Sequence, residues 1–186
     1  MDLAWDSEES KKFVTNVGLI TSNGVYLDNI MACEWTHHVS YHPGLIVVCI
    51  NHNDATNDNI KKTKEFGVNL CAHDQNVISS ISGSNTGKQI DKINVLKELG
   101  YEFYKANKIN CLMVKGAVLN AECKVVNILE LGDHTIFVGE VVNNIVSNKE
   151  PLVYHSNKYW KLGNNIEKPS KKELDRIKKV IEKYRK

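Results

Sequence analysis

The sequence lacks a long apolar run. None of its apolar stretches approaches the roughly 18 residues that a membrane-spanning helix requires. Residues 1–6 are acidic and contain no apolar core of the kind found in secretory signals. A cytoplasmic protein with no membrane partner is therefore expected.

Cysteine and histidine patterns typical of metal sites are also lacking. The five cysteines are odd in number and form no C-x-x-C pair, which argues against a disulfide framework and a zinc ribbon. Most are expected to be small buried apolar residues. His38 and His42 have the i, i+4 spacing of a helical metal pair, but Pro43 follows and the surrounding pattern is β-like. No metal site is predicted.

Two common nucleotide-binding motifs are absent. Residues 83–88 read G-S-N-T-G-K, but the first glycine is one residue too close to Gly87-Lys88 for a P-loop. Gln89 stands where a P-loop has its magnesium-binding Ser or Thr, and no strand is expected directly before the segment. No G-x-G-x-x-G follows a strand either, so neither a nucleoside triphosphatase nor a Rossmann site is expected.

What is present fits one soluble domain with a basic tail. The chain has 186 residues, of which 42% are hydrophobic and 25% are charged. Its formal charge of +2 is uneven, because residues 170–186 carry +5 and the remainder −3. The body gives no reason to expect nucleic-acid binding, and the apolar residues interleaved in the tail suggest packing instead.

Hydrophobic patterning predicts a mostly β protein. The expected strands cover residues 17–21, 29–36, 45–50, 67–70, 111–119, 122–131 and 135–146. The expected helices cover residues 60–66, 77–81 and 91–99. Asn23-Gly24 favours a hairpin turn, and Gly132-Asp133 is expected to join the last two strands. Sequential hairpins of this kind form an antiparallel barrel rather than a doubly wound parallel sheet.

The C-terminus is predicted to be a separate element, residues 166–186, after a domain of residues 1–165. Ser170 and Glu173 form a capping box after Pro169. Apolar residues then recur at helical spacing, namely Leu174, Ile177, Val180, Ile181 and Tyr184. This amphipathic helix needs a surface to cover, either its own barrel or a partner subunit.

An ordered series of segments resembles a known family. Asn29, Met31 and Trp35 form an N-x-M-x-x-x-W strand, and Pro43 precedes the buried strand 45–50. The later segments are the Thr/Asn loop 51–57, F-x-V-N at 66–69, Ser82-Gly83 with Asp91-Lys92, Gly132-Asp133-His134, Gly139-Glu140-Val141 and residues 151–154. In this order, residues 15–162 resemble the FMN-binding split barrels of the flavin-reductase-like family.

The resemblance implies a Greek-key antiparallel barrel with FMN as cofactor, NADH or NADPH as co-substrate, and a homodimer with flavin near its seam. The implied cofactor-binding residues are Asn29, Met31, Ala32, Cys33, Trp35, Thr36, Asn51, Thr56, Asn57, Lys88 and Lys92. The extended strand would present backbone N–H groups to the ring edge. The loop 51–57 would hold the phosphate, with Lys88 or Lys92 supplying positive charge.

His134 is the implied catalytic residue, because the resemblance places the histidine of the G-D-H segment near the flavin and the nicotinamide site, where an imidazole could donate a proton to reduced flavin or orient the hydride donor. The implied activity is hydride transfer from NAD(P)H to FMN, then electron transfer to free flavin, ferric iron or a partner protein. Glu34 stands at a position where family members often carry a small residue, and Gly44 stands where a second proline is more common after Pro43. No catalytic role is assigned to the Cys33 thiol.

Three alternatives remain open from sequence. The chain could be a non-enzymatic FMN electron carrier resembling flavoredoxin. It could be a related split barrel that binds pyridoxal phosphate or haem, although the strand containing Met31 and Trp35 fits these less well. Lastly, the basic tail could bind nucleic acid. Yellow colour, and bleaching by NADH or NADPH without oxygen, would separate the first of these from the enzyme.

Overall fold

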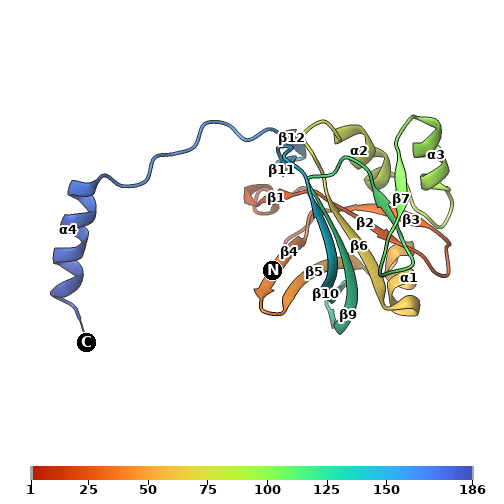
Figure 1. Cartoon of the computed structure of the whole chain (residues 1–186), viewed down its shortest axis with the longest axis horizontal. Coiled ribbons are helices and arrows are strands. Elements are labelled where there is room, and N and C mark those ends of the chain that lie inside the picture. Colours follow the sequence, from red (N-terminus) through yellow and green to blue (C-terminus); the bar gives the residue numbers. More distant parts are fainter. Residues whose placement is uncertain (1, 186) are drawn as a thin grey trace.

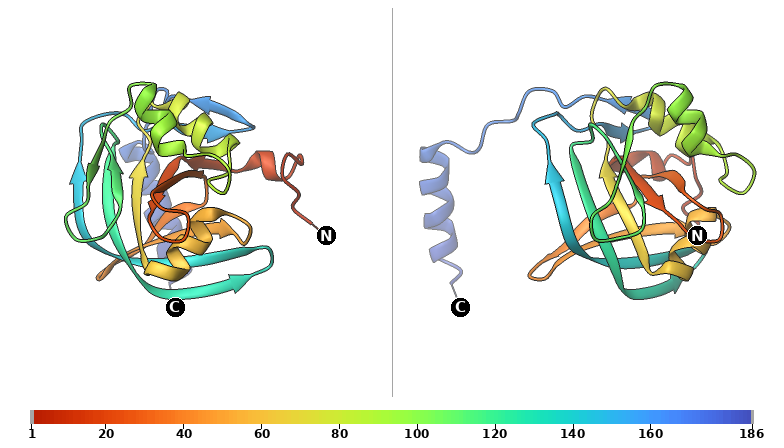
Figure 2. Two further views of the ribbon diagram at one scale, coloured as in Figure 1. Left: turned by 90° about the vertical axis from the view of Figure 1, so that its right-hand side faces the viewer. Right: turned by 45° about the vertical axis from the view of Figure 1, so that its right-hand side comes forward.

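The computed structural model describes residues 2–185 and is built around one coiled antiparallel sheet (Figures 1 and 2). Seven strands form it in the order β3-β2-β6-β9-β10-β5-β4. They are β2 (Gly18–Ser22), β3 (Asn29–Cys33), β4 (Thr36–Tyr41), β5 (Gly44–Asn51), β6 (Glu65–Leu70), β9 (Leu119–Leu131) and β10 (His134–Val146). All neighbouring pairs are antiparallel. The predicted mostly β fold class is confirmed.

Two small sheets extend this frame. One contains β1 (Val14–Asn16), β11 (Val153–His155) and β12 (Lys158–Trp160), and the other pairs β7 (Phe103–Lys105) with β8 (Leu112–Val114). The prediction of one strand over 111–119 is wrong, because the chain turns at Lys115-Gly116, where Gly116 has φ of +80°. The strand predicted at 29–36 also divides, ending at Cys33 and resuming at Thr36.

Three helices pack near β2 and β3. They are α1 (Ala55–Thr63), α2 (Asn76–Ser84) and α3 (Lys92–Glu98), and a short 3-10 turn, η1 (Ser10–Lys12), precedes β1. The helix predicted at 60–66 begins earlier, at Ala55, and ends at Thr63, because Lys64 adopts a left-handed φ of 60°. This shift places Thr56 in the first turn of α1, where backbone N–H groups lack helical acceptors.

The sheet encloses an apolar core around Phe66, Val68 and Phe137, which are fully buried. Two glycines of the predicted motifs serve this packing. A Cβ on Gly139 would lie 2.5 Å from Phe66 Cζ, and one on Gly67 would collide with Thr21 Oγ1. Gly139 also lies at a β-bulge against β9. These glycines allow close approach between strands.

Asn69, the last residue of F-x-V-N, is a buried structural residue. Its Nδ2 donates to Leu19 O at 2.8 Å, and its Oδ1 accepts from Val114 N at 2.8 Å and from Asn120 Nδ2 at 2.6 Å. These bonds tie β6 to β2, β8 and β9, because each partner comes from a different strand.

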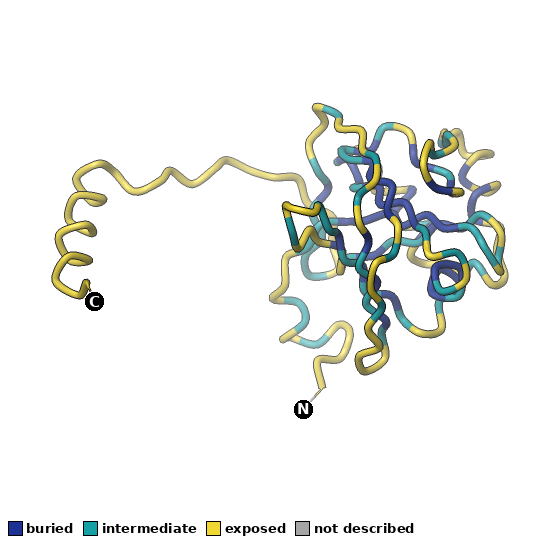
Figure 3. The backbone as a smooth tube through the Cα atoms, turned by 60° about the horizontal axis from the view of Figure 1, so that its bottom comes forward, coloured by how far each residue is buried: buried dark blue, intermediate teal, exposed yellow. Residues whose placement is uncertain are grey.

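The C-terminal helix α4 (Lys171–Glu182) stands away from the sheet at the end of an extended segment (Figure 1). Ser170 Oγ accepts from Glu173 N at 3.3 Å, as the predicted N-terminal cap requires. All of α4 is exposed (Figure 3), and Leu174, Ile177 and Val180 expose 41–47% of their surface. The apolar stripe is therefore not covered by the barrel of its own chain.

None of the helices within residues 2–185 has the length and apolar character needed to cross a bilayer. Among the same residues, His, Cys, Asp and Glu side chains form no group of three or more that could hold a metal ion. His38 lies on β4 and not on a helix, and its ring packs against Tyr41 at 5.6 Å. All five cysteines are free, and four of them are buried.

Candidate functional site

The predicted site residues converge on a cavity of about 540 Å³, the main cavity, formed mostly by β3, β5, the β9–β10 turn and the N-terminal segment. Six of the predicted site residues line it: Met31, Ala32, Cys33, Trp35, Asn51 and His134. The pairing of β10 with β5 places His134 directly opposite Asn51. Antiparallel register thus brings together residues more than 80 positions apart in the sequence.

Trp35 and His134 form the aromatic wall of the main cavity. Their ring centroids lie 4.6 Å apart, and His134 Nδ1 lies 2.7 Å from Asp133 Oδ1. The hydrogen bond from His134 lowers the pKa of the Asp133 carboxyl. Trp35 exposes 53% of its surface, so it is a wall of the cavity and not a core residue.

A smaller hollow of about 150 Å³, the polar niche, joins the main cavity at Met31, Ala32 and Asp54. Its remaining lining residues are Asn29, Ala55, Thr56, Ser82, Gly83, Asn85, Thr86, Gly87 and Lys92. Asn29 Nδ2 donates to Thr56 Oγ1 at 2.8 Å. A Cβ on Gly87 would collide with Asn29 Oδ1, so the glycines of the P-loop-like segment permit close approach to β3.

Lys92 supplies the positive charge of the polar niche. It is only 3% exposed, and its Nζ donates to Ser82 O at 3.1 Å and to Asn85 O at 3.0 Å. Burial lowers its pKa to about 8, against the opposing effect of Asp54. Ser82 Oγ is buried with no hydrogen-bond partner among the described residues. The niche therefore contains an ammonium and an unpaired hydroxyl.

Asp54 lies between the two hollows and lines both. Burial raises the pKa of its carboxyl, while Lys92 acts in the opposite direction. Asp54 directly precedes α1, but its side chain makes no capping bond to the helix. The polar niche thus combines one cation, one carboxylate and the first-turn amides of α1.

Three predicted binding residues lie outside both hollows. Thr36 is buried and its Oγ1 donates to Cys33 O at 3.1 Å. Asn57 is buried in α1, where its Nδ2 donates to Ile50 O at 3.1 Å. Lys88 pairs with Asp58 at 3.2 Å and lies 5.4 Å from the Tyr26 ring centroid. Of the two lysines predicted to supply positive charge, Lys92 lines the polar niche and Lys88 lines neither hollow.

Cys33 and Cys49 both line the main cavity. Cys33 Sγ donates to Cys49 O at 3.4 Å, and burial raises the pKa of the Cys33 thiol to about 11. The Cys33 thiol is therefore protonated at neutral pH, which suits a packing role.

Sequence reasoning missed the N-terminal wall of the site. Leu3, Trp5 and Phe13 line the main cavity although they precede the segments that resembled the family. Asp6 fixes this wall by pairing with Lys11 at 3.2 Å and by accepting from Asn157 Nδ2. No local pattern marked these residues, because the β11–β12 hairpin holds them in place through tertiary contacts.

Comparison with known proteins assigns the chain to a family. Residues 10–163 match the flavin reductase like domain. An uncharacterized protein of Archaeoglobus fulgidus is 31% identical over 65% of this chain and 67% of its own length. An NADH-dependent flavin reductase of Rhodococcus sp is 25% identical over 67% of this chain and 64% of its own length. The reductase component of a 4-nitrophenol monooxygenase of Rhodococcus opacus is 25% identical over 63% of this chain and 58% of its own length.

Solved structures agree. The flavin reductase PheA2 in its native state superposes with a TM-score of 0.73 at 28% identity, covering 88% of this chain and all of the other. Flavoredoxin from Methanosarcina acetivorans gives a TM-score of 0.76 at 24% identity, over 85% and 90% of the two chains, and supports the fold alone. The chain belongs to the flavin-reductase-like family, as its sequence motifs predicted, and the predicted oxidoreductase class is the class of this family.

Proposed function

We propose that this chain binds FMN, accepts a hydride from NADH or NADPH, and passes electrons to free flavin, ferric iron or a partner protein. The observation that carries the proposal is the polar niche joined to an aromatic-walled cavity of suitable size for a planar ring. The names of the flavin reductase relatives support the same activity.

The polar niche fits the phosphate of FMN. A phosphate there would accept from Lys92 Nζ, from the unpartnered Ser82 hydroxyl and from the first-turn amides of α1, whose helix dipole also favours an anion. Thr56 Oγ1 accepts a hydrogen bond from Asn29, which leaves the hydroxyl proton of Thr56 free to donate to the same phosphate. The Asp54 carboxylate, at the junction, is better placed for the hydroxyls of the ribityl chain than for the phosphate.

The main cavity fits the flavin ring. Met31, Ala32 and Cys33 are short or flexible side chains on β3, so the backbone of this strand can approach the polar edge of the ring. Trp35 offers a flat apolar surface beside it. Bound flavin supplies a two-electron acceptor, while the protein positions it and excludes water.

His134 is proposed to orient the hydride donor or to supply a proton beside the flavin. Asp133 holds its Nδ1, so that Nε2 is left for a ligand. The change His134→Asn should slow anaerobic flavin reduction by about tenfold or more with FMN affinity nearly unchanged, measured by stopped-flow absorbance. His38→Asn, on exposed β4, is the control. Equal rates for both variants would contradict the role of His134.

The proposed function is tested by loading the protein with FMN and adding NADH or NADPH without oxygen. Bleaching of the flavin absorption supports an enzyme. A yellow protein that binds FMN but does not bleach supports the alternative, an electron carrier. A colourless protein that does not take up FMN contradicts both.

A further inference from the structure

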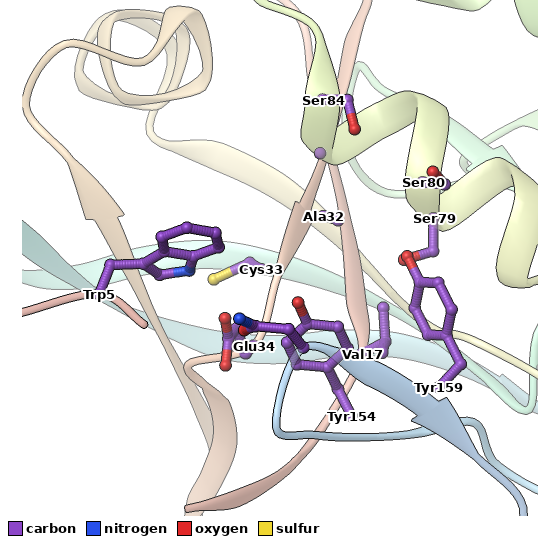
Figure 4. Close-up of a pocket in the computed structure, with 12 residues that line it drawn as sticks. Trp5, Val17, Ala32, Cys33, Glu34, Ser79, Ser80, Ser84, Tyr154 and Tyr159 are labelled. Carbon is purple, nitrogen blue, oxygen red and sulfur yellow. The ribbon is translucent and has the colours of Figure 1, made fainter. Parts of the chain in front are cut away.

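A third hollow, the side chamber, adjoins the main cavity at the C-terminal end of β3 and extends to α2 and the β11–β12 hairpin. It has a volume of about 380 Å³, and it is continuous with the main cavity through shared lining residues, namely Trp5, Ala32, Cys33, Glu34, Tyr154 and Asn157. Figure 4 shows Trp5 and Glu34 facing the tyrosines of the β11–β12 hairpin and the serines of α2. The other lining residues include Tyr159, Ser79, Ser80 and Ser84.

The lining indicates which ligand the side chamber can take. Three aromatic residues offer flat faces for a planar base, and the serines offer hydroxyl groups for a sugar. The Ser79 and Tyr159 oxygens already lie 3.0 Å apart. Glu34 is the one charged residue that lines the chamber within the described part of the chain.

No basic side chain faces Glu34 inside this chamber among the described residues. The lysine that lines the adjoining main cavity, Lys11, is paired with Asp6 at 3.2 Å and with Glu8 at 3.5 Å. An uncompensated carboxylate accepts hydrogen bonds from sugar hydroxyls but repels phosphate groups. The chamber thus suits a neutral nucleoside end and disfavours one that carries an additional phosphate.

We propose that the side chamber binds the adenosine of the reduced dinucleotide and that Glu34 selects NADH over NADPH. This inference rests on the proposed function, because the nicotinamide would lie in the main cavity against the flavin. The Glu34 carboxylate accepts from the ribose 2′-hydroxyl of NADH and repels the 2′-phosphate of NADPH. In dinucleotide sites of an unrelated fold, an acidic side chain likewise accepts a hydrogen bond from the ribose 2′-hydroxyl of NAD.

The kinetic test compares kcat/KM for NADH and NADPH in the FMN-loaded protein. The wild type should favour NADH by about tenfold or more, and Glu34→Gln should narrow this ratio mainly through a lower KM for NADPH. Glu98→Gln, an exposed change at the end of α3, is the matched control and should leave the ratio unchanged. A wild type without NADH preference, or an unchanged ratio in Glu34→Gln, would overturn the inference.

A binding test separates this inference from the proposed function. Isothermal titration of the FMN-loaded protein with adenosine 5′-monophosphate and with adenosine 2′,5′-bisphosphate requires no turnover. Tighter binding of the monophosphate, with the difference reduced in Glu34→Gln, supports the chamber assignment even if neither dinucleotide is oxidised. Failure to bind the monophosphate, or equal binding of the two nucleotides, counts against it.

Discussion

Lys92 gives the proposed phosphate site a pH dependence. Its pKa in the free protein is about 8, and a bound phosphate would raise this pKa by opposing its loss of charge. Near pH 7 and below, the lysine is protonated in both free and bound protein, so affinity for FMN is nearly constant there, and it begins to fall as the pH approaches 8. Above pH 8 binding must take up a proton, and affinity should fall by up to about tenfold per pH unit.

The measurement is a fluorescence titration of FMN from pH 7 to 9.5. Riboflavin, which lacks the phosphate, should show no such decline. The change Lys92→Met should weaken FMN binding and remove the slope, with circular dichroism to confirm that the variant folds. An FMN affinity that is flat with pH in the wild type would place the phosphate away from Lys92.

Gly139 makes a testable contribution at the scale of one strand. Its missing side chain lets β10 pass Phe66 and Cys123, because a Cβ would lie 2.5 Å from Phe66 Cζ and 2.8 Å from Cys123 Cβ. Gly139→Ala should lower the free energy of unfolding by roughly 1–3 kcal/mol through overpacking, measured by urea denaturation. Gly163→Ala is the control, since no atom lies within 4 Å of a Cβ built there. Equal stability of the two variants would show that the core relaxes freely.

Elements defined by local signals could be predicted from sequence. The β9–β10 hairpin follows from long apolar strands around Gly132-Asp133, and α4 follows from its Ser170 cap and helical spacing. Elements that depend on a distant partner could not. The strand β8 pairs with the three-residue strand β7, and the chain turns away at residues 115–118 before β9 begins. Both features depend on contacts outside the segment itself.

The candidate site shows the same division. Residues of β3 could be predicted because they share one strand with a recognisable pattern, and the structure gathers Met31, Ala32 and Cys33 in one cavity. Thr36 and Asn57 matched the pattern too, but their side chains satisfy buried backbone carbonyls instead. Asp54 lies in the predicted loop 51–57, although it was not among the predicted binding residues, whereas Trp5 reaches the site through tertiary packing that no local spacing encodes.

At the scale of the whole molecule, strands β5 and β10 present an apolar face on the outside of the sheet. Buried residues of β5 and β10 alternate with half-exposed ones that point outward, namely Leu45, Val47, Cys49, Ile136 and Val138. The register pairs Val47 with Val138 and Cys49 with Ile136, so the outward side chains form a contiguous patch. Cys49 also lines the main cavity, and the patch therefore adjoins the proposed flavin site.

We expect this outer face to pair with a second copy, which would make the protein an obligate homodimer with flavin near the seam. Such interfaces bury on the order of 2,000 Å² or more and are apolar at the centre. Val138→Glu should therefore shift sedimentation equilibrium toward monomer and release FMN on dilution, because burying an unpaired carboxylate is costly. Val25→Glu, a change at a residue that is 60% exposed in the loop between β2 and β3, should leave the dimer intact.

Removal of residues 166–186 tests whether α4 adds to the same interface, because its apolar stripe is exposed in the single chain. A wild-type protein that stays folded, monomeric and flavin-bound at low micromolar concentration would contradict the dimer.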